Sequence, residues 1–221
     1  MRRRSHTSAL AGALLVLLAL LAGCASLRPG TAPPTLYALD TVPASVSAAM
    51  GEGGGSKSAP PAGEGAPTLV INPPRAAAGY DSQRMIYLRQ PYALEYFAHS
   101  QWIETPAHML QPLIAAAIER SGRFAAVLQA PVSATGDLRL ETELVRLQQE
   151  FLGRPSRAHV TLRATLTDTA TRRVVAAQTF DAVVPAASDD PYGGVVAANQ
   201  AVQQVLEQLA DFCKAATGEA R

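Results

Sequence analysis

The sequence has few of the residues on which enzymes and metalloproteins depend. It contains two cysteines and four histidines among 221 residues, and no Gly-x-Ser-x-Gly, phosphate-loop or dinucleotide-binding motif. His99 and His108 lie nine positions apart, with no Cys, Asp or His at the spacing of metal ligands. We therefore predict no catalytic residues, no metal site and no cofactor, and we predict that the protein is not an enzyme.

Charged and aromatic side chains are also sparse. The formal net charge is +1 and aromatic residues make up 5% of the chain, so the basic surface of a nucleic-acid-binding protein is missing. We predict no nucleic-acid partner. The apolar residues are dominated by Ala and Val, which predicts a core of small side chains packed between an extensive sheet and long helices.

The first 24 residues have the pattern of an exported lipoprotein. Arg2-Arg3-Arg4 precede a short apolar run, which ends in Leu21-Ala22-Gly23-Cys24. A basic start, a short apolar segment and small residues form a secretory signal, and the run is shorter than the roughly 20 apolar residues of a transmembrane helix. The last four residues resemble a bacterial lipobox, which implies cleavage before Cys24 and a covalent lipid on its thiol. The alternatives are an ordinary signal peptide or a single anchor helix.

With Cys24 assigned to lipid, Cys213 is left alone and an intramolecular disulfide is impossible. Cys213 falls on the apolar face of a predicted helix, which favours a small buried side chain over a reactive or intermolecular thiol.

Composition divides the chain into four parts. We predict a signal peptide at 1–23, a Pro-rich tether at 24–34, one folded domain at 35–216 and a tail at 217–221. Inside the domain, the Gly-, Pro- and Ser-rich stretch 44–67 cannot bury enough apolar surface to offset its ordering entropy. We expect a flexible loop there, inserted between two strands of one sheet.

Alternating apolar and polar residues predict most of the strands. We expect strands at 35–39 and 68–71, a hairpin of 84–88 with 92–97, and a meander of 138–144, 158–167 and 174–184. The meander has one apolar and one polar face, which fits a sheet covered on one side. The predicted fold class is α+β: a single domain with a mainly antiparallel sheet, two helices packed on one face, and a long C-terminal helix.

Two amphipathic helices follow from the remaining pattern. Thr105-Pro106 predicts the start of the first, with Thr as the cap, and Pro112 inside it predicts a kink or a late start. Asp189-Asp190-Pro191 predicts the start of the second, with a carboxylate cap. The second helix should run for about 24 residues, or about 36 Å.

Arg84, Tyr87 and Trp102 form a candidate partner-contact or structural motif around the hairpin. Trp102 stands just before the first helix, where its rings can be buried under the helix or can anchor a partner or lipid. Arg84 is expected to pair with Glu95 or Glu104.

These motifs together resemble a known family. The lipobox, the Tyr-x-Leu strand at 37–39, the Arg-x-x-Tyr strand at 84–87 and the Ser-x-Trp-x-x-x-Pro segment at 100–106 are similar to those of ABC-type transport auxiliary lipoproteins, which are associated with MCE-type lipid transporters. The resemblance covers about residues 35–212 without the Gly-rich loop. Gln101 departs from the Arg that often precedes the Trp in this family.

The resemblance implies a non-enzymatic auxiliary component that docks the transporter's periplasmic assembly at the outer membrane. The implied partner is an MCE-domain protein. Because a protein that receives a tubular partner assembly would need a matching shape, we predict a ring-shaped homo-oligomer. Ala25, in place of the Asp that retains such proteins in the inner membrane, implies a lipid anchor on the periplasmic face of the outer membrane. The alternatives are a lipoprotein that carries a lipid in its own apolar pocket, and a periplasmic hydrolase.

The lipid anchor can be tested at Cys24. We expect Cys24→Ser to abolish incorporation of radiolabelled palmitate, because the serine lacks the thiol that is acylated. The unchanged chain is the positive control, and label that persists in the variant would contradict the predicted anchor.

Overall fold

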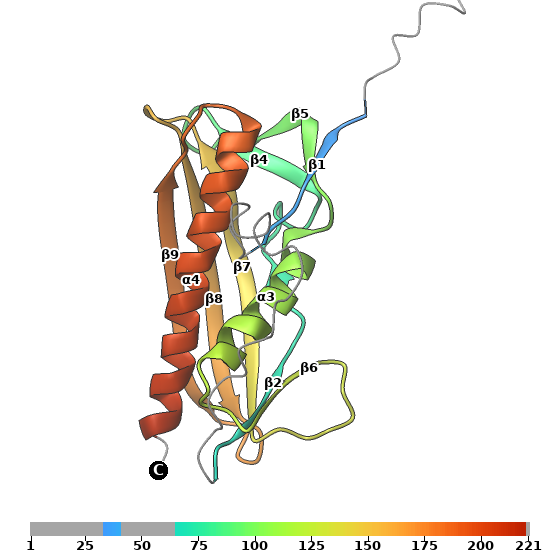
Figure 1. Ribbon diagram of the computed structural model, residues 1–221, viewed down its shortest axis with the longest axis vertical. Helices are drawn as coiled ribbons and strands as arrows, with labels where there is room; N and C mark the ends of the chain where they lie inside the picture. The colour runs from blue at the N-terminus through green and yellow to red at the C-terminus, as the bar shows by residue number, and fades with distance from the viewer. Residues whose placement is uncertain (1–32, 41–64, 220–221) are drawn as a thin grey trace, which may run out of the picture. The chain divides into compact units, whose positions relative to one another are not determined.

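Figure 1 shows a computed structural model of the protein, which describes residues 33–40 and 65–219. The signal peptide, Cys24, almost all of the tether and most of the Gly-rich loop lie outside the described residues. The elements in chain order are β1 (Thr35–Tyr37), β2 (Thr68–Ile71), β3 (Arg75–Ala76), β4 (Arg84–Leu88), β5 (Glu95–Trp102), α3 (Pro106–Arg120), β6 (Ala126–Gln129), β7 (Leu138–Glu150), β8 (Arg157–Asp168), β9 (Val174–Pro185) and α4 (Pro191–Glu219).

The 13-residue strand β7 lies at the centre of the sheet. Along one edge it pairs antiparallel with β8 over its whole length. Along its other edge it pairs with three short parallel strands in succession: β2 at 138–140, β3 at 143–144 and β4 at 148–150. A single long strand therefore holds both halves of the sheet together.

The outer strands extend the sheet from these partners. β9 pairs antiparallel with β8, and β5 pairs antiparallel with β4, which confirms the predicted meander and hairpin. β1 pairs parallel with β5, and β6 pairs parallel with β2. The parallel pairings were not predicted, because alternation indicates a strand but neither its partner nor its direction. The strand β3 was not predicted because two residues show no alternation.

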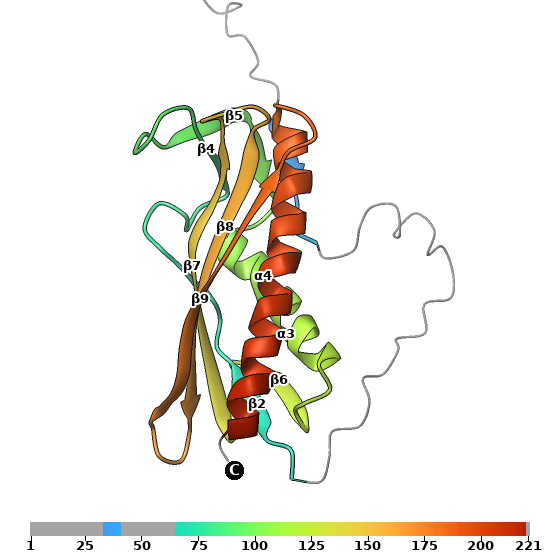
Figure 2. The same cartoon turned by 90° about the vertical axis from the view of Figure 1, so that its left-hand side faces the viewer.

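Both helices cover one face of the sheet, as predicted. Figure 2 shows α3 and α4 on the same side, with α4 running along β8 and β9. The meander turns its apolar side chains toward α4, among them Val160, Leu162 and Phe180, which are fully buried. The interface contains many small residues, as the composition predicts: Ala158, Ala164, Ala182, Ala197, Ala198 and Ala201 are all buried.

The first helix begins where predicted but is not capped as predicted. α3 starts at Pro106, and the Thr105 side chain makes no capping hydrogen bond. The Thr105 N–H instead donates to Glu104 Oε1 at 2.7 Å. The helix runs through Pro112 to Arg120, so the late start is wrong, and Gly122 follows with a φ of +64°. A positive φ is well tolerated by glycine, which suits the chain reversal after the helix.

The second helix starts at Pro191 as predicted and extends over 29 residues, longer than expected. Asp190 Oδ1 accepts a hydrogen bond from the Gly193 N–H at 2.8 Å, so Asp190 caps the helix. The predicted carboxylate cap is therefore confirmed, with Asp190 as the capping residue and Asp189 in another role. Asp189 Oδ1 accepts from the Ser156 N–H at 2.7 Å and ties the start of α4 to the β7–β8 loop.

Cys213 lies on the buried face of α4, as predicted. Burial raises the pKa of its thiol to about 12, so the side chain stays protonated and packs as a small apolar group. Within the described residues, no helix is both long and apolar enough to cross a membrane.

A substitution at Gly193 tests the close contact between α4 and the loop that precedes it. A methyl group at this position would overlap the backbone oxygen and hydroxyl of Ser188. We expect Gly193→Ala to lower the free energy of unfolding by about 1–2 kcal/mol, because overpacking costs more than the gain of about 1 kcal/mol in helix propensity. Urea denaturation measures the change.

The matched control for this prediction is Gly153→Ala in the β7–β8 loop. An added methyl group there meets no atom within 4 Å. Its free energy of unfolding should change by less than about 0.5 kcal/mol. Equal effects of the two substitutions would contradict the assigned contact.

Candidate functional site

The β4–β5 hairpin brings the three residues of the predicted motif together on two paired strands. Arg84 stands opposite Gln101, next to Trp102, whereas Tyr87 stands opposite Glu95 near the hairpin loop. Arg84 and Trp102 therefore lie at one end of the hairpin and Tyr87 lies at the other. Each side chain has different surroundings.

Arg84 is exposed and stacks on an aromatic ring. Its guanidinium carbon lies 4.8 Å from the centre of the Tyr96 ring, which is a cation–π contact. The predicted ion pair with Glu95 or Glu104 is not formed. Glu95 instead accepts a hydrogen bond from the Tyr87 hydroxyl, and Glu104 lies 3.8 Å from His108 Nδ1.

Tyr87 is buried and joins the hairpin to the β7–β8 loop. Its ring centre lies 4.5 Å from that of Phe97 and 5.8 Å from that of Phe151. Its hydroxyl donates to Glu95 Oε2 at 2.9 Å, and this hydrogen bond, together with burial, raises the pKa of Tyr87. The tyrosine therefore acts as a neutral hydrogen-bond donor that fixes the hairpin.

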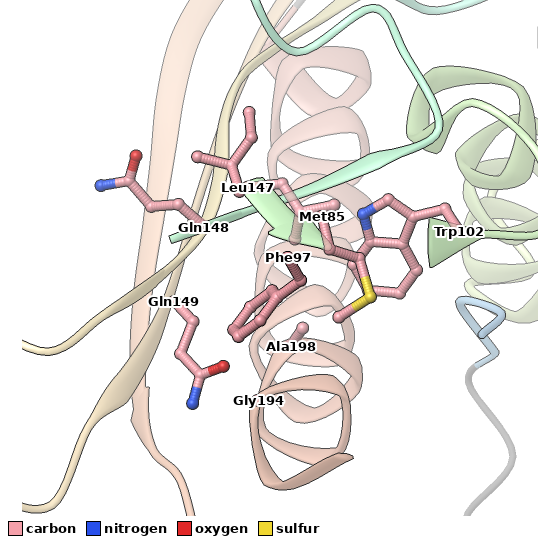
Figure 3. A pocket seen from close by; sticks show the side chains of 9 residues that line it. Met85, Phe97, Trp102, Leu147, Gln148, Gln149, Gly194 and Ala198 are labelled. Carbon is pink, nitrogen blue, oxygen red and sulfur yellow. The ribbon is translucent and has the colours of Figure 1, made fainter. Parts of the chain in front are cut away.

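Trp102 is only 4% exposed and lies in the interior at the end of β5. It lines a small cavity with Met85, Phe97, Leu147 and Ala198, close to the first turn of α4 (Figure 3). The cavity has a volume of about 20 Å³, enough for about one water molecule. This position fits the structural alternative for Trp102, because a buried indole offers no surface to a partner.

A second group of side chains on the sheet was not identified from the sequence. Glu150, His159 and Asp181 come from β7, β8 and β9 and lie on the face away from the helices. His159 Nδ1 lies 2.8 Å from Glu150 Oε1, and His159 Nε2 lies 2.9 Å from Asp181 Oδ1. The side chains of Glu150 and His159 are only 7% and 15% exposed. The imidazole thus bridges two carboxylates across three strands.

Hydrogen-bond donors surround both carboxylates of this network. Burial raises the pKa of Glu150, but hydrogen bonds from Gln148, His159 and Arg157 outweigh it and hold the pKa below its usual value. The pKa of Asp181 is also raised by burial, but hydrogen bonds from Thr161 and His159 outweigh this effect and lower the pKa. Both carboxylates are therefore ionised at neutral pH.

Further hydrogen bonds tie this network to other parts of the sheet. The Thr161 hydroxyl donates to Asp181 Oδ1 at 2.5 Å, which adds a second link between β8 and β9. The Tyr80 hydroxyl donates to Gln148 Oε1 at 2.6 Å, so the segment before β4 is attached to the same network. Across the described residues, no three His, Cys, Asp or Glu side chains are arranged to hold a metal ion.

The sequence contains only a weak signal for this network. Gln148, Glu150 and His159 occupy polar positions of alternating strands, which ordinarily face solvent. Their convergence depends on the register of β7 with β8, which shifts between Leu144 and Arg146. A register that contains a shift cannot be obtained from alternation alone.

Comparisons with known proteins agree with the sequence resemblance. A family model described as "ABC-type transport auxiliary lipoprotein component" matches residues 54–210. The crystal structure of a DUF330 protein from Xanthomonas campestris is similar, with a TM-score of 0.64 and 27% identity, over 69% of this chain and 87% of that one. A second crystal structure, of an uncharacterized protein, has a TM-score of 0.60 over 82% of this chain and 99% of that one, and at 10% identity it shows the fold alone. None of the curated proteins matches the sequence.

The pH dependence of stability tests the network. Because the pKa of Glu150 is lowered from its ordinary 4.5 in the folded protein, its charge stabilises the fold above that pH, and this stabilisation is lost as the pH falls through the lowered pKa. We expect Glu150→Gln to cost about 2 kcal/mol at pH 7, from the loss of hydrogen bonds to a charged group, and much less at pH 3. Urea denaturation at both values measures this.

Glu141→Gln is the control for Glu150→Gln, because Glu141 lies on the same strand with an exposed side chain. It should change the free energy of unfolding by less than about 0.5 kcal/mol at either pH. A cost of Glu150→Gln that is the same at pH 7 and pH 3 would show that the charge of Glu150 is not what stabilises the sheet.

Proposed function

The chain belongs to the family of ABC-type transport auxiliary lipoprotein components, and we propose that it docks the periplasmic assembly of an MCE-type lipid transporter at the outer membrane. In this proposal, acyl chains on Cys24 anchor the domain on the periplasmic face of that membrane. The protein acts by binding and positioning its partner, and it has no catalytic role.

The observation that carries this proposal is the family match from residue 54 to residue 210. It includes the β4–β5 hairpin, the Trp102 corner and most of α4, so the folded domain corresponds to the family except for β1 and the end of α4. An auxiliary component needs a transporter as its partner. The MCE-domain protein is the partner that the resemblance to this family implies.

The packing between sheet and helices supports docking over the alternative of carrying a lipid. The cavity beside Trp102 has about 20 Å³, whereas pockets for small molecules have about 300–1,000 Å³. The larger hollow, of about 570 Å³, is an open groove between α3 and α4. Arg120, Glu207 and Asp211 line this groove, and such charges would not favour an acyl chain.

The open edge of β9 supports the proposed homo-oligomer. Over the described residues, β9 pairs with β8 on one side and with no strand on the other. The strand has 12 residues and includes the exposed side chains of Val174, Val175 and Val183. Asp181 is its single charged residue. Long edges with so little charge favour pairing with another chain, and a second copy is the partner always present.

Two measurements on the full-length acylated protein test the proposal. Native mass spectrometry from detergent should give oligomers without bound phospholipid, and crosslinking in cells should recover the MCE-domain protein. The Cys24→Ser variant is the control, and it should lose the crosslink because it is no longer held at the outer membrane. Monomers that retain a phospholipid after purification would favour the lipid-carrying alternative.

A further inference from the structure

One end of the domain presents exposed apolar side chains from three separate segments. Tyr92 in the β4–β5 loop is 102% exposed, Leu152 in the β7–β8 loop is 44% exposed, and Tyr192 in the first turn of α4 is 61% exposed. Leu94 beside Tyr92 is also exposed. We call this surface, formed by residues 89–94, 151–156 and 186–192, the loop end. Such side chains gathered on one surface mark an interaction site.

Strand register places these segments at the same end of the sheet. Leu88 stands opposite Glu150, Glu150 stands opposite Arg157, and Arg157 stands opposite Pro185. The β4–β5, β7–β8 and β9–α4 connections therefore all leave the sheet at one end. Figures 1 and 2 both show this end uppermost, with the start of α4 beside the loops.

Hydrogen bonds join the three segments into one platform. The Phe151 N–H donates to the Leu88 carbonyl at 2.7 Å, and the Ala186 N–H donates to the Ser156 carbonyl at 2.7 Å. The Ser156 N–H donates to Asp189 Oδ1 at the same distance. The backbones of the three segments are therefore connected to one another, which brings their exposed side chains onto one preformed surface.

The first described strand, β1, starts on the side of the domain where the loop end lies. β1 runs parallel to β5, with Thr35 opposite Ser100, and β5 starts at Glu95 next to the loop that carries Tyr92. Pro34, which precedes Thr35, therefore lies at the end of β1 that is nearer to the loop end. Cys24 lies ten residues before Pro34, a length that spans at most about 35 Å. A membrane that holds Cys24 is thus within reach of this end.

We propose that the loop end rests on the phospholipid surface to which Cys24 is anchored. This inference depends on the lipid anchor of the proposed function and adds the orientation of the domain. Tyrosines suit the boundary between acyl chains and head groups, because the ring is apolar and the hydroxyl is polar. Leu94 and Leu152 supply additional apolar area at the same surface.

The charged residues of the loop end fit a phospholipid surface. Arg89 and Arg154 are exposed on the two loops, and the Arg89 guanidinium also donates to the Tyr87 hydroxyl at 3.2 Å. Long basic side chains at such positions can reach lipid phosphates. The acidic residues nearby are engaged within the protein. Asp189 accepts from the Ser156 N–H and Asp190 accepts from the Gly193 N–H, and these hydrogen bonds lower the pKa of both carboxyl groups.

This orientation makes the domain stand upright on the membrane. α4 has 29 residues, which at about 1.5 Å per residue gives a length of about 44 Å. The β8–β9 turn and the end of α4 then lie about that far from the lipid surface. A partner reaching across the periplasm would meet this far end or the sides of the domain.

Tryptophan scanning of the acylated full-length protein tests the contact. Tyr192→Trp and Tyr92→Trp each place a fluorophore at the loop end, and Val174→Trp places one at the exposed β8–β9 turn. Each variant is reconstituted into phosphatidylethanolamine–phosphatidylglycerol liposomes with and without brominated lipid. The buried Trp102 contributes the same background to every sample, which the unchanged protein measures.

We expect brominated lipid to quench about half of the added emission in Tyr192→Trp and Tyr92→Trp, and to leave Val174→Trp unchanged, because this quenching requires contact with the lipid. No quenching at either loop-end position, or equal quenching at Val174→Trp, would overturn the proposed orientation. Liposome flotation and the mass of the acylated chain are measured on the same samples. Failure of flotation or a missing acyl mass refutes the anchor, whereas absence of quenching in protein that is acylated and floats refutes only the contact.

Discussion

Strand β7 pairs with other strands along both of its edges, and the rest of the fold depends on these pairings. On one edge it meets β8 without a break other than the shift near Arg146, and on the other it meets β2, β3 and β4 one after another. Three short strands cannot form a stable sheet by themselves, because each has too few pairs to offset its ordering entropy. Pairing with one long strand aligns them end to end. The β4–β5 hairpin that positions Arg84 and Trp102 is therefore placed by the last residues of β7.

The same end of β7 also positions α4. The buried Gln149 side chain donates to Ser156 Oγ at 2.9 Å and to the Asp190 carbonyl at 3.2 Å. Gly194 lies directly against this side chain, and any side chain at 194 would collide with it. A short polar connection thus links the central strand, the β7–β8 loop and the helix start. The platform that we propose to face the membrane is built on this connection.

Sequence patterns predicted the features that repeat over many residues. The meander, the starts of both helices, the buried Cys213 and the Ala-rich core all follow from periodicity and composition, and the structure agrees. Patterns failed where one residue has two possible partners. Arg84 was expected to pair with a carboxylate but stacks on Tyr96. For the pair Asp189-Asp190, the sequence could not decide which carboxylate caps α4 and which bonds to Ser156. The Glu150–His159–Asp181 network needs a register with a shift in it, which no local pattern contains.

The surfaces of the domain differ in a way that suits an auxiliary component. One face of the sheet is closed by helices, with space for about one water molecule beside Trp102. The other face is cross-linked by hydrogen-bonded polar side chains on three adjacent strands, and satisfied polar networks of this kind rigidify a structure. A rigid, closed domain has little capacity to rearrange around a cargo, but it can hold a partner at a fixed distance from a membrane. The structural features that argue against a carrier are therefore the same ones that favour docking.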